Sequence, residues 1–144
     1  MKAIIRIVGH VKVSVDLKET LYRMHAHKKY TLVLFPSVPA TDTLLQTVRN
    51  FTAYGEIDAK TLTALLVARA QPIDKKKKID EKTAEIMAEQ LLSEKKTLTD
   101  YGLKPFFRLH PPRGGIDARL HFPKKKGVLG DNKEEINDLI RRML

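Results

Sequence analysis

The segment 104–126 concentrates the residue types that are best suited to binding a polyanion. It holds seven Lys or Arg residues against Asp117 alone, so it carries +6 of the net charge of +10 found in the whole 144-residue chain. Arginine can grip a phosphate through two parallel hydrogen bonds or stack on a base, and cations that neutralise phosphates release condensed counterions. This concentration of charge predicts a phosphate-binding surface, and folded RNA is the expected ligand.

Proline, glycine and apolar residues are interleaved with these cations. The prolines and glycines exclude a long helix or a central strand, and they stand at Pro105, Pro111, Pro112, Pro123, Gly114, Gly115 and Gly127. The apolar residues argue against a disordered tail, and they are Phe106, Phe107, Leu109, Ile116, Leu120 and Phe122. We therefore expect an extended loop that Phe106, Phe107 and Leu109 anchor to the domain, with its cations facing outward. A solvated loop whose lysines serve only solubility is the alternative.

A set of residues in and after this segment is expected to contact RNA. The adjacent glycines 114 and 115 would let backbone amides approach phosphate oxygens without a Cβ atom in the way. Two arginines close the last helix, where they are equally suited to interact with the helix dipole or with phosphates. The expected contacts are Arg108, His110, Arg113, Gly114, Gly115, Arg119, His121, Lys124, Lys125, Lys126, Arg141 and Arg142.

Hydrophobic periodicity predicts the elements that must position these residues. Strand-like and helical segments alternate from the first residues onward, at about 3–8, 16–24, 31–35, 41–51, 52–57 and 58–66. A capping box, Asp16-x-x-Glu19, is expected to open the first helix, and Asp58 to cap the third. This order predicts the class α+β, with a small sheet and helices packed on it.

The chain is expected to form one domain with four parts. We assign 1–73 to a compact α+β core and 74–103 to a charged linker with an added helix, in which Ala84, Met87, Ala88 and Leu91 share one face. The basic RNA-binding loop occupies 104–130. The C-terminal helix falls within 131–144, and its apolar face contains Ile136, Leu139, Ile140 and Met143.

The composition of the chain and the absence of catalytic sequence motifs argue against secreted, membrane-spanning, enzymatic and metal-binding proteins. The absence of cysteine excludes disulfides and thiolate chemistry, and it fits a reducing cytoplasm. The first apolar run is too short and too charged for a signal peptide or a membrane span. We find no G-x-S-x-G or glycine-rich phosphate motif, and His25 and His27 cannot share a helix face as metal ligands. No enzyme activity, cofactor or metal is expected. A small-molecule regulatory module and a membrane-surface protein remain as rivals.

Three separated motifs resemble the ribosomal protein L-thirty family of the large subunit, and its archaeal branch most closely. They are Leu-His-Pro-Pro-Arg-Gly-Gly at 109–115, Ile-Asn-Asp-Leu-Ile-Arg-Arg-Met at 136–143, and Phe-Thr-Ala-Tyr-Gly-Glu at 51–56. The resemblance covers essentially the whole chain. One departure is 126–131, where Lys-Gly-Val-Leu-Gly-Asp replaces the Gly-Gly-Asp-Ala-Gly-Asn turn of eukaryotic relatives.

The resemblance implies a fold, a role and a set of partners. The fold would be a compact sheet with helices, related to the ferredoxin-like fold, with a longer C-terminal region than bacterial members have. The role would be structural, in the large subunit of cytoplasmic ribosomes, bound to large-subunit ribosomal RNA and beside neighbouring ribosomal proteins. The family's Pro-Arg-Gly-Gly loop corresponds to Pro112, Arg113, Gly114 and Gly115.

Overall fold

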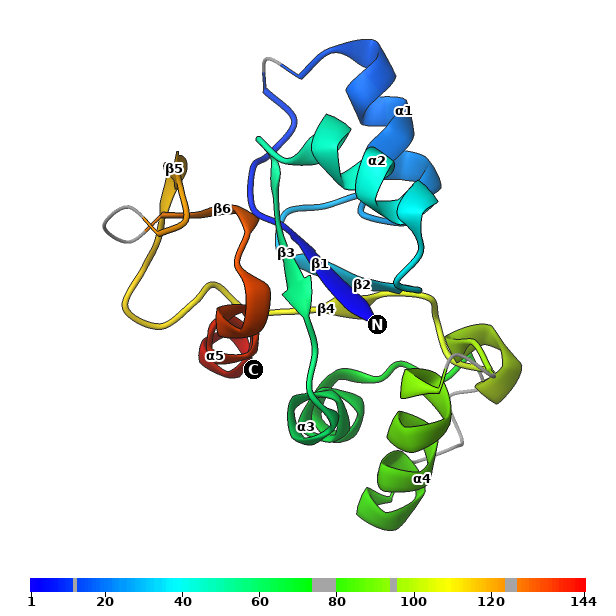
Figure 1. Ribbon diagram of the computed structural model, residues 1–144. Coiled ribbons are helices and arrows are strands. Elements are labelled where there is room, and N and C mark those ends of the chain that lie inside the picture. The colour runs from blue at the N-terminus through cyan, green and yellow to red at the C-terminus, as the bar shows by residue number, and fades with distance from the viewer. Residues whose placement is uncertain (12, 74–79, 94–95, 124–126) are drawn as a thin grey trace.

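The computed structural model describes residues 1–144 except 12, 74–79, 94–95 and 124–126 (Figure 1). The strands are β1 (Lys2–Arg6), β2 (Thr31–Phe35), β3 (Thr52–Glu56), β4 (Phe107–Arg108), β5 (Asp117–His121) and β6 (Gly127–Asp131). The helices are α1 (Val15–Arg23), α2 (Pro39–Val48), α3 (Ala59–Arg69), α4 (Glu81–Leu92) and α5 (Ile136–Met143), with short 3-10 turns η1 (Leu98–Tyr101) and η2 (Lys133–Glu135). Among the described residues, no helix has both the length and the apolar composition to cross a membrane.

The strands form one mixed sheet in the order β4-β2-β1-β3-β6-β5. β1 pairs antiparallel with β2 and β3, and β2 pairs antiparallel with β4. β6 is parallel to both β3 and β5, so it is an interior strand of the sheet. The predicted α+β class and the strand-helix-strand-helix-strand order of the first five elements are confirmed.

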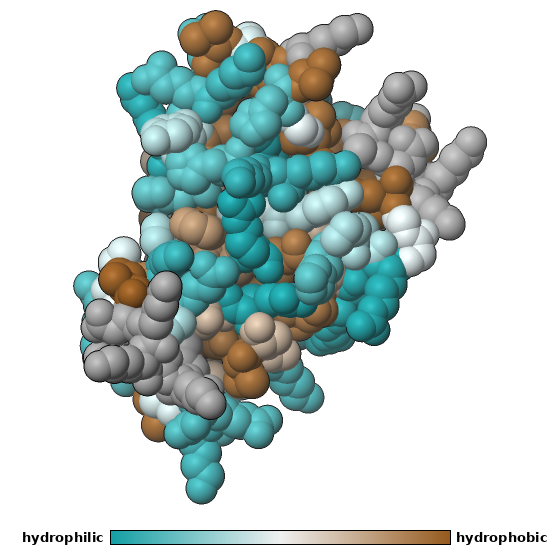
Figure 2. Space-filling view, turned by 180° about the vertical axis from the view of Figure 1, so that it is seen from behind, coloured by the Kyte–Doolittle hydropathy of each residue, from teal (hydrophilic) through white to brown (hydrophobic). Residues whose placement is uncertain are grey.

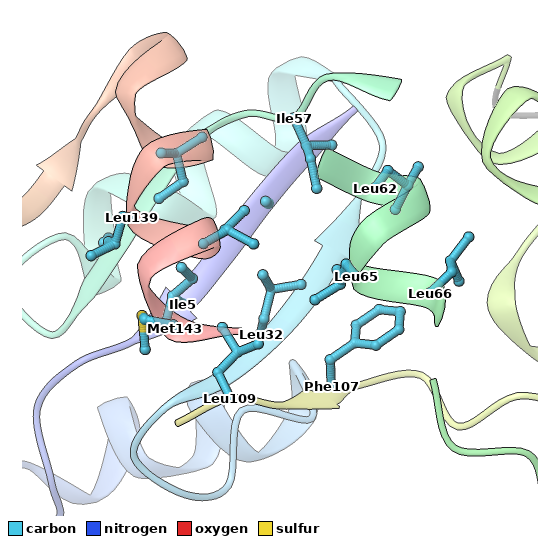
Figure 3. Close-up of a cluster of buried hydrophobic side chains, with 14 of the residues drawn as sticks. Ile5, Leu32, Ile57, Leu62, Leu65, Leu66, Phe107, Leu109, Leu139 and Met143 are labelled. Carbon is cyan, nitrogen blue, oxygen red and sulfur yellow. The ribbon is translucent and has the colours of Figure 1, made fainter. Parts of the chain in front are cut away.

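Alternating residues of the sheet build a core on each face. Ile4 belongs to the cluster under α1 and α2, whereas its neighbour Ile5 belongs to the cluster under α3 and α5. Figure 3 shows the second cluster, with Ile5 and Leu32 of the sheet between Leu65 of α3 and Met143 of α5. α4 packs on α3 and adds buried side chains to this same cluster, namely Ala84, Ala88 and Leu91.

Two helix starts differ from the prediction. The expected capping box is wrong, because α1 begins at Val15 with Ser14 as its N-cap residue, and Asp16 lies inside the first turn. The carboxylate of Glu19 instead pairs with Arg23 at 2.5 Å, one helical turn further on. α2 begins at Pro39 rather than near 41, since a proline without an N–H group suits the first position of a helix.

The largest difference concerns the segment 104–130. An extended loop was predicted there, but the structure has the strands β4, β5 and β6, and β6 lies inside the sheet. The prolines do not oppose this arrangement, because Pro105, Pro111 and Pro123 flank the strands rather than interrupt them. The stretch 127–131, expected to be a turn before the last helix, is β6 itself.

Candidate nucleic-acid interface

The four residues Pro112 to Gly115 form a tight turn, named here the Arg113 turn. The Gly115 amide donates a hydrogen bond to the Pro112 carbonyl at 3.1 Å, and Gly114 and Gly115 have φ angles of +78° and +68°. Glycine adopts this left-handed region without the steric cost that other residues incur. The glycines are therefore required by the shape of the turn. The Gly115 amide already donates inside it, which corrects the expectation that both amides face phosphate.

The C-terminal end of α5 holds the Arg113 turn in place. The amides of His110 and Arg113 donate to the carbonyls of Met143 and Arg142 at 2.9 and 3.0 Å, which are last-turn carbonyls without partners inside the helix. In return, Arg142 Nε donates to the Arg113 carbonyl at 2.9 Å and Arg142 Nη2 to the Gly115 carbonyl at 2.8 Å. These four bonds fix the backbone on either side of Arg113, whose own side chain is exposed.

α5 is itself locked to the end of β3. Buried Asn137 donates to the Glu56 carbonyl at 3.0 Å and accepts from the Asp58 amide at 3.1 Å. β3 also comes very close to the turn before α5, because a Cβ atom on Gly55 would lie 2.2 Å from the carbonyl oxygen of Lys133. Only glycine permits this approach. The position of the Arg113 turn is thus set by the core of the protein through α5.

The two arginines at the end of α5 have different partners. Arg141 forms ion pairs with Asp58 at 3.1 Å and with Asp138 at 3.2 Å, so two carboxylates already offset its charge. Arg142 donates to neutral carbonyls of the Arg113 turn and keeps its positive charge. The sequence shows two adjacent arginines after an apolar helix face, but it does not show that one of them positions a turn 29 residues earlier in the chain.

β4 attaches the start of the basic segment to the sheet. The predicted anchors are confirmed, since Phe107 and Leu109 are 1% and 8% exposed in the main core and Phe106 packs against the other core cluster. Arg108 Nη1 donates to Thr31 Oγ1 at 3.1 Å, and the guanidinium lies 5.7 Å from the centroid of the Phe106 ring. Arg108 is therefore a half-buried cation at the edge of the sheet rather than a mobile one.

The remaining candidates divide between two parts of the molecule. His110 is exposed directly before the Arg113 turn. Arg119 and His121 lie on β5, at the opposite edge of the sheet from β4, and His121 is exposed. Lys124, Lys125 and Lys126 fall outside the described residues. Hydrogen bonds thus bring His110, Arg113 and Arg142 together, whereas Arg108 lies on β4 at one edge of the sheet and Arg119 and His121 lie on β5 at the other edge.

Figure 2 shows the face opposite to the view of Figure 1. Hydrophilic side chains dominate the centre of this face, and apolar ones gather at its upper end, where Figure 1 places α1 and α2. The fold and the Arg113 turn define a class, namely small basic α+β proteins that present an exposed arginine on a rigid turn.

Comparison with known proteins gives the family. No protein-family model matches the chain. It is 40% identical over 153 residues to the large ribosomal subunit protein uL30 of Archaeoglobus fulgidus, covering 99% of each protein. It is 38% identical to the uL30 protein of Nanoarchaeum equitans and 35% identical to that of Haloarcula marismortui, again over 99% of the chain. The chain therefore belongs to the uL30 family, and the resemblance seen in its sequence motifs is confirmed.

Proposed function

We propose that the chain is a structural constituent of the large ribosomal subunit and binds large-subunit ribosomal RNA through the Arg113 turn. The observation that carries this proposal is similarity along 99% of the chain to archaeal proteins that are named as large-subunit proteins. The role is in translation, as part of a ribonucleoprotein beside neighbouring ribosomal proteins, in ribosomes of the cytoplasm. It includes no enzymatic step, and family membership favours it over a small-molecule regulatory module.

The geometry of the Arg113 turn supports RNA binding in a specific way. Four backbone and side-chain hydrogen bonds hold the turn on α5, while the Arg113 side chain faces solvent. A turn that is already ordered loses little conformational entropy when it binds. The exposed Arg113 guanidinium can then make charge-assisted hydrogen bonds with a phosphate, and His110 beside it can add a further polar contact.

A binding experiment with the full chain and a transcript of large-subunit ribosomal RNA tests the proposal. The logarithm of the affinity should fall by roughly 0.7 to 0.9 per phosphate contact for each tenfold rise in salt. Arg113→Ala should weaken binding by about 1 to 3 kcal/mol without changing the urea unfolding midpoint.

The matched control is Lys82→Ala, which removes the same charge from an exposed site on α4. Binding that ignored salt would contradict the electrostatic part of the proposal. Equal affinities for Arg113→Ala and Lys82→Ala would contradict the assignment of the contact to the Arg113 turn.

A further inference from the structure

A second group of basic residues lies outside the basic segment, between α1 and β2. The chain contains no Asp or Glu between Glu19 and Asp42, and the stretch 24–30, named here the α1–β2 turn, contains His25, His27, Lys28 and Lys29. Lys28 and Lys29 are exposed, and neither forms an ion pair with any residue that the structure describes. The proposed contact with RNA at the Arg113 turn leaves this charge without a role.

His25 occupies a backbone position that favours glycine. Its amide donates to the Tyr22 carbonyl and the Ala26 amide to the Leu21 carbonyl, both at 2.9 Å, which is the pattern that closes a helix with a left-handed residue. His25 has φ +59° and its imidazole is exposed. An exposed histidine at a position where glycine would be less strained is a candidate for a functional side chain.

Hydrogen bonds from a buried arginine hold the α1–β2 turn in place. Arg6 is 1% exposed, and its guanidinium donates to the carbonyls of Ala26 at 2.8 Å, His27 at 3.0 Å and Gly9 at 3.1 Å. Within 1–11, 13–73, 80–93, 96–123 and 127–144, no carboxylate pairs with Arg6. Its charge is hydrogen-bonded but not neutralised, so the turn is rigid and lies over a positive charge.

His27, in the same turn, is also surrounded by basic residues. Its Nδ1 atom is buried and has no hydrogen-bond partner among the described residues, and its ring meets the Tyr22 ring edge-on, with centroids 4.3 Å apart. Burial lowers the pKa of His27 below its ordinary value, and the nearby cations His25, Arg108 and Arg6 lower it further. An anion at this surface would meet the charges of Lys28 and Lys29, with Arg6 buried beneath them.

The α1–β2 turn adjoins the start of the basic segment. The Leu109 amide donates to the Tyr30 carbonyl at 2.9 Å, and Arg108 donates to Thr31 at the beginning of β2. From Leu109 the chain needs only two further residues to reach Pro112 and the Arg113 turn. The two cationic groups are thus joined through β4, which favours one extended polyanion over two separate small ligands.

We infer that the α1–β2 turn is a second contact site for the sugar–phosphate backbone of the same RNA, made by Lys28, Lys29 and His25. This inference rests on the proposed function. Contacts at two rigid points would fix the orientation of the protein on the RNA as well as its affinity.

The test compares two charge-reversed proteins for binding to the same ribosomal RNA transcript at about 0.15 M salt. The double variant Lys28→Glu/Lys29→Glu should bind about 10-fold more weakly than Lys60→Glu/Lys82→Glu, which makes the same charge change at exposed sites on α3 and α4. It should also show a smaller dependence of affinity on salt. Equal binding by the two variants overturns the second site.

The variant His25→Gly distinguishes an effect on RNA affinity from an effect on the stability of the fold. Glycine relieves the left-handed strain, so the variant should melt at a higher temperature than the parent while binding RNA a few-fold more weakly. A higher melting temperature with unchanged affinity overturns the role of His25. If the parent protein does not bind the transcript, the proposed function itself fails. If the parent binds and Arg113→Ala weakens it but Lys28→Glu/Lys29→Glu matches its control, only the second site fails.

Discussion

Two turns of the molecule are organised by an arginine that donates hydrogen bonds to backbone carbonyls, and they differ in burial. Arg6 is 1% exposed and holds the α1–β2 turn, whereas exposed Arg142 holds the Arg113 turn. Buried carbonyls that lose their donor cannot turn to water, but exposed ones can. The same chemistry is therefore expected to stabilise the fold at one turn and to position the exposed Arg113 at the other.

The largest expected effect comes from removing the buried donor. Arg6→Met should lower the free energy of unfolding by about 3 kcal/mol or more, because several part-buried carbonyls lose their partner at about 1 to 3 kcal/mol each. Urea denaturation measures this change. Arg23→Met is the control, since its exposed pair with Glu19 contributes only about 0.5 kcal/mol. Similar losses of stability in Arg6→Met and Arg23→Met would show that the buried hydrogen bonds of Arg6 contribute no more than an exposed ion pair.

A smaller effect, in binding rather than in stability, is expected at the exposed turn. Arg142→Lys keeps the charge but loses the planar fork that reaches two carbonyls, so RNA affinity should fall by about 1 kcal/mol. The urea midpoint should change little. Arg141→Lys serves as the control, because Arg141 pairs with Asp58 and Asp138 instead of the turn. Unchanged affinity in Arg142→Lys would mean that Arg142 does not position the turn.

The smallest expected effect is a pH dependence at the buried side of the α1–β2 turn. Burial, with help from His25, Arg108 and Arg6, lowers the pKa of His27 below 6.5 in the folded protein. The unfolded chain then binds this proton more tightly, so the stabilising contribution is present above about pH 6.5 and is lost as the pH falls toward the folded pKa.

His27→Gln should therefore lose less stability than the parent protein between pH 7.5 and 5.5, as measured by urea denaturation. The comparison of the two proteins cancels the other titrating groups. An identical loss in both would show that His27 does not carry this dependence.

Sequence patterns predicted the elements that depend on local spacing better than those that depend on a distant partner. The apolar spacing of Ile136, Leu139, Ile140 and Met143 predicted α5, because a helix face is a local property of the chain. β6 was missed because its pairing with β3 is parallel and depends on a partner more than 70 residues away. Local signals such as nearby prolines carry no information about such a partner.

In the candidate site too, local features were predicted and contacts between distant parts of the chain were not. The exposure of Arg113 and the burial of Phe107 follow from local composition, and both were predicted. The roles of Arg142 and Arg6 were not, because a long side chain can bond to a carbonyl far away in sequence and its target depends on the folded backbone. The adjacency of the α1–β2 turn and the basic segment was not predicted for a related reason, since the two meet through the pairing of β2 with β4.

Crosslinking on purified large ribosomal subunits tests the proposed RNA contact, because it reports membership of the particle and the site of contact in one measurement. We expect RNA-crosslinked peptides from this protein to map to the Arg113 turn and its flanking residues His110 and Arg108. Absence of the protein from the subunit, or crosslinks confined to the exposed faces of α3 and α4, would contradict this expectation.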